Sequence, residues 1–129
     1  MDGGARGNPG PAAVAAVASA PDGGDLAERH AYIGEATNNV AEYRAVLLGV
    51  ELARELGASE VEVVNDSELI ARQLQGRYKV KSAGLKPLFL ETLQALRNFD
   101  RWTVRTVRRE SNERADELVN EALDEQRLR

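Results

Sequence analysis

Hydrophobic and polar positions recur along this chain with two different periods, and each period predicts one kind of secondary structure. The β-branched run 61–64 has the composition of a strand buried in a sheet. Between Thr37 and Leu56, apolar residues recur three or four positions apart, which predicts a helix closed by Gly57. Because segments of both kinds are interleaved over most of the chain, the pattern indicates an α/β protein.

The remaining segments extend this alternation to three strands, a helix, a strand, two helices, a strand and a last helix. The expected bounds are 12–19 and 26–34 for the second and third strands, 61–66 for the fourth, 86–97 for the third helix and 102–107 for the fifth strand. Two antiparallel hairpin steps come first, and the later strands join through helices as right-handed crossovers. We therefore expect a five-stranded mixed sheet with helices on both faces.

Finer patterns predict which side chains point inward. In the third strand, the face that carries Ala31 and Ile33 is the better candidate for the core. The fifth strand is expected to be two-sided, with Trp102, Val104 and Thr106 alternating with Thr103, Arg105 and Val107. Ser111 is expected to cap the last helix. The third helix is expected to bury Leu88, Leu90 or Glu91, Leu93 and Leu96, and the last helix Ala115, Leu118, Val119, Ala122 and Leu123.

Composition narrows the class of protein. The length of 129 residues fits one domain, 1–129, and the absence of cysteine excludes disulfides, zinc–thiolate sites and cysteine nucleophiles. No apolar run approaches the roughly 20 residues that cross a bilayer. The formal net charge of −4 argues against a broad basic surface, although a local basic patch remains compatible with it. We expect a monomer in the cytoplasm that does not associate with membranes.

Four acidic residues lie at positions where chemistry is possible. Asp2 precedes a glycine-rich loop, Glu42 lies in the first turn of the long helix, and Asp116 lies early in the last helix. Asp66 follows a buried strand, and carboxyl ends of strands are where open α/β sheets bind ligands. The simpler interpretations are that Asp66 only caps the next helix and that Glu42 only complements a helix dipole.

The residues around these acids carry a resemblance to a known family. The stretches 2–11 (DGGARGNPGP), 37–43 (TNNVAEY), 65–67 (NDS) and 112–118 (NERADEL) closely resemble the four motifs of type I ribonuclease H. The likeness covers essentially the whole chain, with the motifs in the family's order. It implies a ribonuclease H-like fold and an endonuclease that cuts the RNA strand of RNA–DNA hybrids, leaving 5′-phosphate and 3′-hydroxyl ends.

The resemblance also implies a metal site. Asp2, Glu42, Asp66 and Asp116 match the family's catalytic, metal-binding acids. Carboxylates forced together repel one another unless divalent cations lie between them, and hard oxygen ligands suit Mg²⁺ or Mn²⁺. Two such ions about 4 Å apart activate the attacking water and stabilise the leaving oxygen. Both metal ions are expected to be bound only when the substrate is present, because Mg²⁺ completes its coordination shell with substrate phosphate.

Substrate contacts follow from the same resemblance. Asn8, Asn38 and Asn39 match positions that contact the hybrid's minor groove, where short amides read 2′-hydroxyls. Thr37 resembles a residue of the DNA-phosphate pocket. Tyr78 resembles a ring that packs on the DNA strand, with Lys79 and Lys81 among the cations that reach phosphates. Alternatively, Asn8 and Asn38 are turn and cap residues, and the loop around Tyr78 is a solvated surface.

Three features of the chain depart from the family pattern: a segment, a single residue and a loop. Residues 76–85 replace the basic helical protrusion of longer members, and Glu68 stands where the family often has a neutral or basic contact residue. The loop before the last acid has no histidine, as in the compact archaeal and actinobacterial branch. We assign Arg109 in that loop to product release or phosphate handling, with an ordinary surface arginine as the alternative.

The start of the chain is the last departure. Only Met1 precedes Asp2, where family members have several strand residues, so the sequence is clipped or its first strand is unusually short. The hypothesis is that Asp2 frays and that the terminal ammonium competes with the metal. A damaged site would leave a hybrid-binding module of the same fold that does not cut. Another nuclease of the superfamily, such as a junction resolvase, fits less well because of the Asn38–Asn39 pair and the glycine loop.

Overall fold

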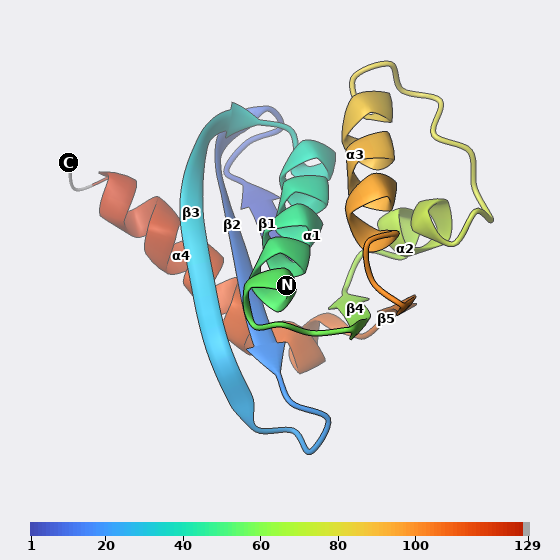
Figure 1. Cartoon of the computed structure of the whole chain (residues 1–129). Coiled ribbons are helices and arrows are strands. Elements are labelled where there is room, and N and C mark those ends of the chain that lie inside the picture. Colours follow the sequence, from blue (N-terminus) through green and yellow to red (C-terminus); the bar gives the residue numbers. More distant parts are fainter. Residues whose placement is uncertain (128–129) are drawn as a thin grey trace.

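A computed structural model describes residues 1–127, apart from the side chain of Arg109 (Figure 1). Its elements are β1 (Asp2–Ala5), β2 (Gly10–Ser19), β3 (Asp25–Ala36), α1 (Asn38–Glu55), β4 (Glu60–Asn65), α2 (Glu68–Leu74), α3 (Lys86–Leu96), β5 (Arg101–Thr106), the 3₁₀ turn η1 (Arg109–Asn112) and α4 (Glu113–Arg127). Their order is the expected one, and most bounds agree with the pattern to within one or two residues.

The strands form an antiparallel section and a parallel section, which confirms the fold class. β1, β2 and β3 pair antiparallel, with Asp2 opposite Ala15, and β4 pairs parallel with β5, with Val63 opposite Val104. The two sections form separate hydrogen-bonded ladders. They meet at Met1, whose ammonium donates to the carbonyl oxygen of Val64 at 3.3 Å.

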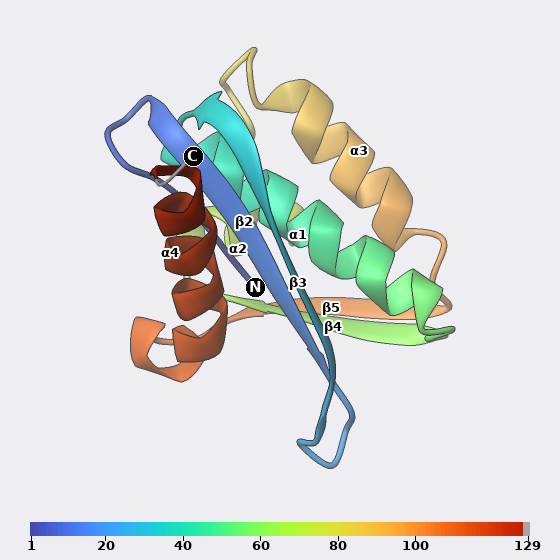
Figure 2. The ribbon, with the colours of Figure 1, turned by 90° about the vertical axis from the view of Figure 1, so that its left-hand side faces the viewer.

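Helices cover both sides of this arrangement (Figures 1 and 2). α1 lies between the antiparallel section and α3, and α4 crosses the opposite face of β2 and β3. The middle strand β2 is rich in alanine, and its residues 12–16 are all buried. Small side chains let helices pack closely from both sides, so a sequence of low β-propensity becomes the central strand here.

Two groups of buried side chains hold the layers together. The group under α4 packs the inward face of that helix on β2 and comprises Ala13, Ala15, Leu118, Val119, Ala122 and Leu123. Ala115, the remaining residue of the predicted inward face, is buried as well. The larger group joins α1, α2, β4, β5 and the α3 region, and it comprises Tyr43, Val46, Val50, Ala53, Val63, Ile70, Ala71, Leu74, Val80, Leu85, Leu96, Phe99 and Val104. Ala31 and Ile33 are partly buried, on the side of β3 that was expected to face inward.

Several local predictions were wrong. Leu90 is 61% exposed, whereas Thr92 is buried, its hydroxyl donating to the carbonyl oxygen of Leu88 at 2.7 Å. That backbone acceptor satisfies the hydroxyl, so Thr92 takes an inward place that hydrophobicity alone does not reveal. In β5, Val104 is buried and Trp102 is partly buried, whereas Thr103 and Arg105 on the other face are exposed. Ser111 lies inside η1 instead of capping α4, because the chain makes a 3₁₀ turn first.

Asp2 is not frayed, contrary to the hypothesis. It is 7% exposed and paired in the β1–β2 ladder. Asn112 holds Met1, the residue before Asp2, in place. The amide nitrogen of Asn112 donates to the carbonyl oxygen of Met1 at 2.6 Å, and its amide oxygen accepts from the Met1 ammonium at 3.4 Å. These contacts hold the start of β1 against η1, the turn that leads into α4.

Candidate active site

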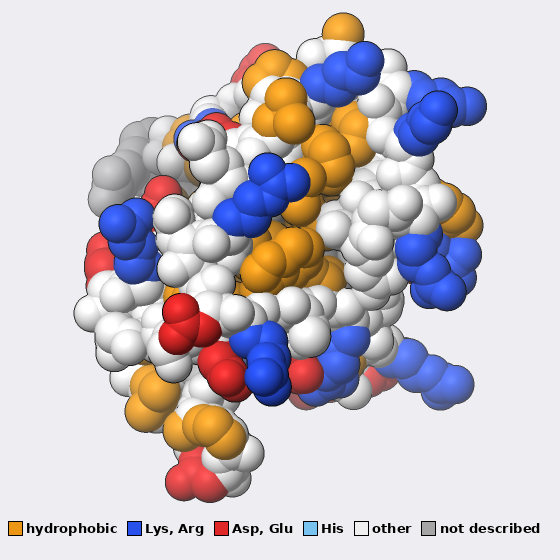
Figure 3. Space-filling view, turned by 45° about the vertical axis from the view of Figure 1, so that its right-hand side comes forward, with side chains coloured by type: hydrophobic (Ala, Val, Ile, Leu, Met, Phe, Trp, Pro, Cys, Tyr) orange, Lys and Arg blue, Asp and Glu red, His pale blue; other side chains and the backbone are white. Residues whose placement is uncertain are grey.

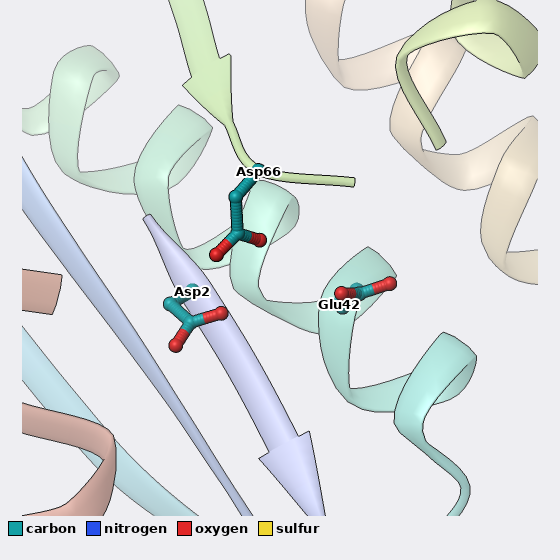
Figure 4. A group of neighbouring side chains, drawn as sticks. All are labelled: Asp2, Glu42 and Asp66. Atoms are coloured by element: carbon teal, nitrogen blue, oxygen red, sulfur yellow. The ribbon is translucent and has the colours of Figure 1, made fainter. Parts of the chain in front are cut away.

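Three of the four acids lie together at the point where β1, α1 and β4 meet (Figure 4). Asp2, Glu42 and Asp66 each offer a carboxylate oxygen, and these oxygens lie within 4.8 Å of one another. Asp2 begins β1, Glu42 lies in the second turn of α1, and Asp66 directly follows β4. The fold therefore brings together groups that are up to 64 positions apart in the sequence.

The close approach of β1 to α1 depends on Gly3. A Cβ at this position would overlap the backbone carbonyl of Ala41, one residue before Glu42. With no side chain at Gly3, the start of β1 packs directly against the first turns of α1. Asp2 and Glu42 therefore lie beside each other because of a backbone contact.

Asp66 follows β4, but it is not the cap of α2. The hydroxyl of Ser67 accepts from the backbone N–H of Ile70 at 3.3 Å and performs that role. The interpretation of Asp66 as a helix cap is therefore wrong. Its carboxylate faces Asp2 instead (Figure 4).

Asp116 joins the other three acids around one open cavity of about 570 Å³. A hydrogen bond links its carboxyl to that of Asp2. Burial, the charge of Asp66, the hydrogen bond to Asp116 and the charges of Asp116 and Glu42 together raise the pKa of Asp2 to about 7, and burial has the largest effect. Burial also lowers the pKa of the Met1 ammonium, against the opposite effect of Asp2 and Asp66. The site concentrates negative charge in a partly desolvated place.

The residues expected to contact substrate lie in two regions. Asn38 and Asn39 line the cavity. Asn8 lies beside them, since its amide oxygen accepts from the backbone N–H of Asn38 at 3.1 Å, and the amide oxygen of Asn38 accepts from Ala5 N–H at 2.9 Å. Thr37 caps α1 through a hydroxyl that accepts from Val40 N–H at 3.3 Å.

Tyr78, Lys79 and Lys81 lie apart from the cavity, on the exposed segment that follows α2. The Arg72 guanidinium donates to the Tyr78 hydroxyl at 2.6 Å, lies 5.3 Å from the ring centroid and pairs with Glu68. Figure 3 shows the face that includes this segment and α3, with Lys and Arg side chains along its upper and right-hand margins and hydrophobic side chains in a hollow between them. Because Arg72 pairs with it, Glu68 has an intramolecular partner.

Some residues near the cavity were not predicted as site residues. Asn65 is buried beside Asp66, and its Oδ1 has no hydrogen-bond partner among the described residues. Arg6 and Asn120 line the cavity as well. Arg6 and Asn65 belong to the motifs quoted above, but nothing in their spacing shows where their side chains point. Arg109 begins η1, and its side chain lies outside the described residues.

Comparisons with known proteins agree with this fold and site. Residues 1–122 match a protein family described as reverse transcriptase-like. The chain is 44% identical over 125 residues to ribonuclease HI of Halobacterium salinarum, covering 97% of this chain and 63% of that protein. It is 45% identical over 124 residues to the bifunctional protein Rv2228c of Mycobacterium tuberculosis, covering 95% of this chain and 34% of that protein. The chain thus spans less than two thirds of these relatives.

Solved structures give the same result. The crystal structure of ribonuclease H1 from Halobacterium salinarum has a TM-score of 0.94 at 44% identity and covers 96% of this chain and 94% of that one. LC11 ribonuclease H1 in complex with an RNA/DNA hybrid has a TM-score of 0.92 at 48% identity, covering 97% and 94%. A mixed sheet with acids at the meeting point of β1, α1 and β4 defines the ribonuclease H-like class of α/β proteins. Within that class, the chain belongs to the type I ribonuclease H family.

Proposed function

We propose that this chain is an endonuclease that hydrolyses the RNA strand of RNA–DNA hybrids and leaves 5′-phosphate and 3′-hydroxyl ends. The observation that carries the proposal is the cluster of Asp2, Glu42 and Asp66, whose carboxylate oxygens lie within 4.8 Å of one another, with Asp116 beside them. The complex of LC11 ribonuclease H1 with an RNA/DNA hybrid supports the choice of substrate.

The donor set fits hard divalent cations. Asp2, Glu42, Asp66 and Asp116 supply only oxygen ligands, as Mg²⁺ and Mn²⁺ prefer. Burial and the neighbouring carboxylates raise the pKa of Asp2, and the repulsion between the carboxylates is relieved when positive charge lies between them. Asn65 borders a small cavity together with three of these acids, and its buried Oδ1 has no hydrogen-bond partner among the described residues. Two bound ions would activate the attacking water and stabilise the leaving 3′ oxygen.

The asparagines are suited to the hybrid's minor groove. Backbone N–H groups only donate, so the amide oxygens of Asn8 and Asn38 face the protein. Their Nδ2 groups then serve as donors toward acceptors such as 2′-hydroxyl oxygens and the minor-groove edges of bases, together with Asn39. With these contacts, we expect the RNA strand to lie over the acids.

The remaining contacts are assigned to the DNA strand and to product release. Tyr78 would stack on the DNA strand, and Arg72 holds its ring in place. Lys79 and Lys81 would contact phosphates beyond it, and Thr37 a DNA phosphate near the start of α1. Arg109 is proposed to handle phosphate or release product.

A cleavage assay tests the proposal. Labelled RNA–DNA hybrid, double-stranded RNA and double-stranded DNA are incubated with Mg²⁺, Mn²⁺ or EDTA, and the ends of the products are identified. Hybrid should be cut only with a divalent ion. Asp66→Asn should lower the rate at least about 100-fold, since even outer partners of metal ligands are worth 10–100-fold. Circular dichroism checks that the variant folds.

Other results would lead to a different conclusion. Binding of hybrid without cleavage under all metal conditions would identify a binding module, and cleavage that Asp66→Asn leaves intact would remove the proposed site.

Within residues 1–127, no helix is long and apolar enough to span a membrane. A monomeric state and a cytoplasmic location stay predictions, which size-exclusion chromatography and fractionation would check.

A further inference from the structure

Arg6 lies in the turn between β1 and β2 and borders the acidic cavity. The cavity is otherwise lined by acids, amides and small or apolar side chains, so Arg6 is the one cation among the described residues around it. A nucleic acid strand that reaches four carboxylates brings further negative charge with it. A cation at the margin of the cavity is therefore placed where it would attract a phosphodiester.

The turn presents Arg6 in a fixed position. Its backbone N–H donates to the carbonyl oxygen of Pro11 at 2.8 Å. A Cβ on Gly10 would overlap the carbonyl of Arg6, so the two sides of the turn pack against each other. The preceding Ala5 N–H donates to Asn38, which ties the turn to α1. Because the backbone is secured on both sides, only the side chain has to adjust when a ligand arrives.

The guanidinium has one intramolecular partner that a phosphate can replace. Its Nη2 lies 2.8 Å from Oδ1 of Asp124 on α4, and the two side chains are 36% and 61% exposed. Ion pairs this exposed contribute little to stability. A phosphodiester offers two oxygens in the geometry that a guanidinium binds with paired hydrogen bonds.

We propose that Arg6 binds a backbone phosphodiester of the RNA strand next to the acidic cluster, and that Asp124 holds the guanidinium over the cavity until the hybrid displaces it. The strand is assigned as RNA because the acids at the same cavity would cut that strand, so this inference rests on the proposed function. The competing explanation is that the Arg6–Asp124 pair only ties the turn to α4.

The two explanations are distinguished by substituting each residue of the pair in turn. Phosphate binding by Arg6 predicts different effects of the two substitutions, and a structural tie predicts equal effects. If Arg6 binds phosphate, Arg6→Gln should weaken hybrid binding about 3- to 10-fold and lower the slope of log Kd against log salt by about one. Asp124→Asn should leave the affinity unchanged or raise it a few-fold, with the slope retained. If the pair is only a tie, both substitutions should weaken binding alike.

The experiment measures Kd for a labelled hybrid at several salt concentrations in Mg²⁺, in proteins that also carry Asp66→Asn, and KM and kcat in proteins that do not. Arg29→Gln is the matched control, because Arg29 pairs with Glu55 at a similar exposure of 38% and 58% and does not line the cavity. Arg6→Lys should restore the salt slope. Melting temperatures show whether each variant is folded.

Equal losses in Arg6→Gln and Asp124→Asn, or a salt slope in Arg6→Gln equal to that of Arg29→Gln, would overturn the inference. In either case, a parent protein that still cuts hybrid leaves the proposed function standing. If the parent protein neither cuts nor binds hybrid, the proposed function and this inference both fail.

Discussion

At the scale of single residues, burial and the nearby carboxylates raise the pKa of Asp2 above its ordinary value. Its pKa of about 7 means that the carboxyl group of Asp2 is about half protonated at neutral pH when no cation is present. All four acids could be proposed from the sequence, because each lies in a recognisable motif. Arg6 could not, since its relation to the cavity depends on the turn and on the position of α4. The role of Asn65 also depends on burial, which a single residue type does not reveal.

This pKa predicts how stability depends on pH without metal. Asp2 in the unfolded chain loses its proton near pH 4, and in the folded protein near pH 7. The folded state therefore binds the extra proton between these values, so its contribution to stability is present at low pH and is lost as the pH rises towards 7. In EDTA, melting temperatures at pH 5 to 8 should fall more steeply for the natural protein than for Asp2→Asn.

A control and a metal titration sharpen that prediction. Asp100→Asn alters an exposed acid and should keep the natural pH dependence. Mg²⁺ or Mn²⁺ should raise the melting temperature more at pH 8 than at pH 5, because protons compete with the cation at the lower pH. The prediction fails if Asp2→Asn and the natural protein show the same pH dependence in EDTA.

The contact between β1 and α1 decides the geometry of the site at the scale of secondary structure elements. Hydrophobic periodicity locates α1 and β4 well, because their buried faces repeat along the sequence. It does not show that Gly3 lies against Ala41, since that contact involves backbone atoms from two elements. For the same reason, the division between two ladders could not be predicted from the pattern of side chains.

Gly3→Ala should therefore destabilise the protein by about 2–3 kcal/mol, the upper range for an overpacked core. Gly4→Ala is the matched control, because a Cβ there would lie at an ordinary 3.8 Å from Cγ1 of Val119. Urea unfolding measures both variants, and the control should change the free energy of unfolding by less than about 1 kcal/mol. Equal effects at the two positions would show that β1 adjusts without cost.

Across the whole molecule, the two buried groups lie on either side of the antiparallel section. β2 supplies side chains to the group under α4, and α1 packs on the same strand from the other side. The prediction of one domain over 1–129 rests on composition and length, and it stays a prediction. A chain whose layers share one strand should unfold as a unit.

Unfolding by urea tests this prediction with two probes. Trp102 packs against the larger buried group, so its fluorescence reports on that side, while far-UV circular dichroism reports on all helices. The two transitions should coincide. Val119→Ala, which alters only the group under α4, should shift both to lower urea by the same amount, whereas a shift in circular dichroism alone would indicate two independent units.

Ser67, which follows Asp66, makes it possible to alter the acid without altering the fold. The hydroxyl of Ser67 caps the first turn of α2, so the carboxylate of Asp66 is not needed to stabilise that helix. Under the proposed function, Asp66→Asn should therefore yield a protein that accumulates in cells at the usual level and still binds RNA–DNA hybrid without cutting it. The phenotype of such an allele would then report the loss of the proposed reaction and not the loss of the protein.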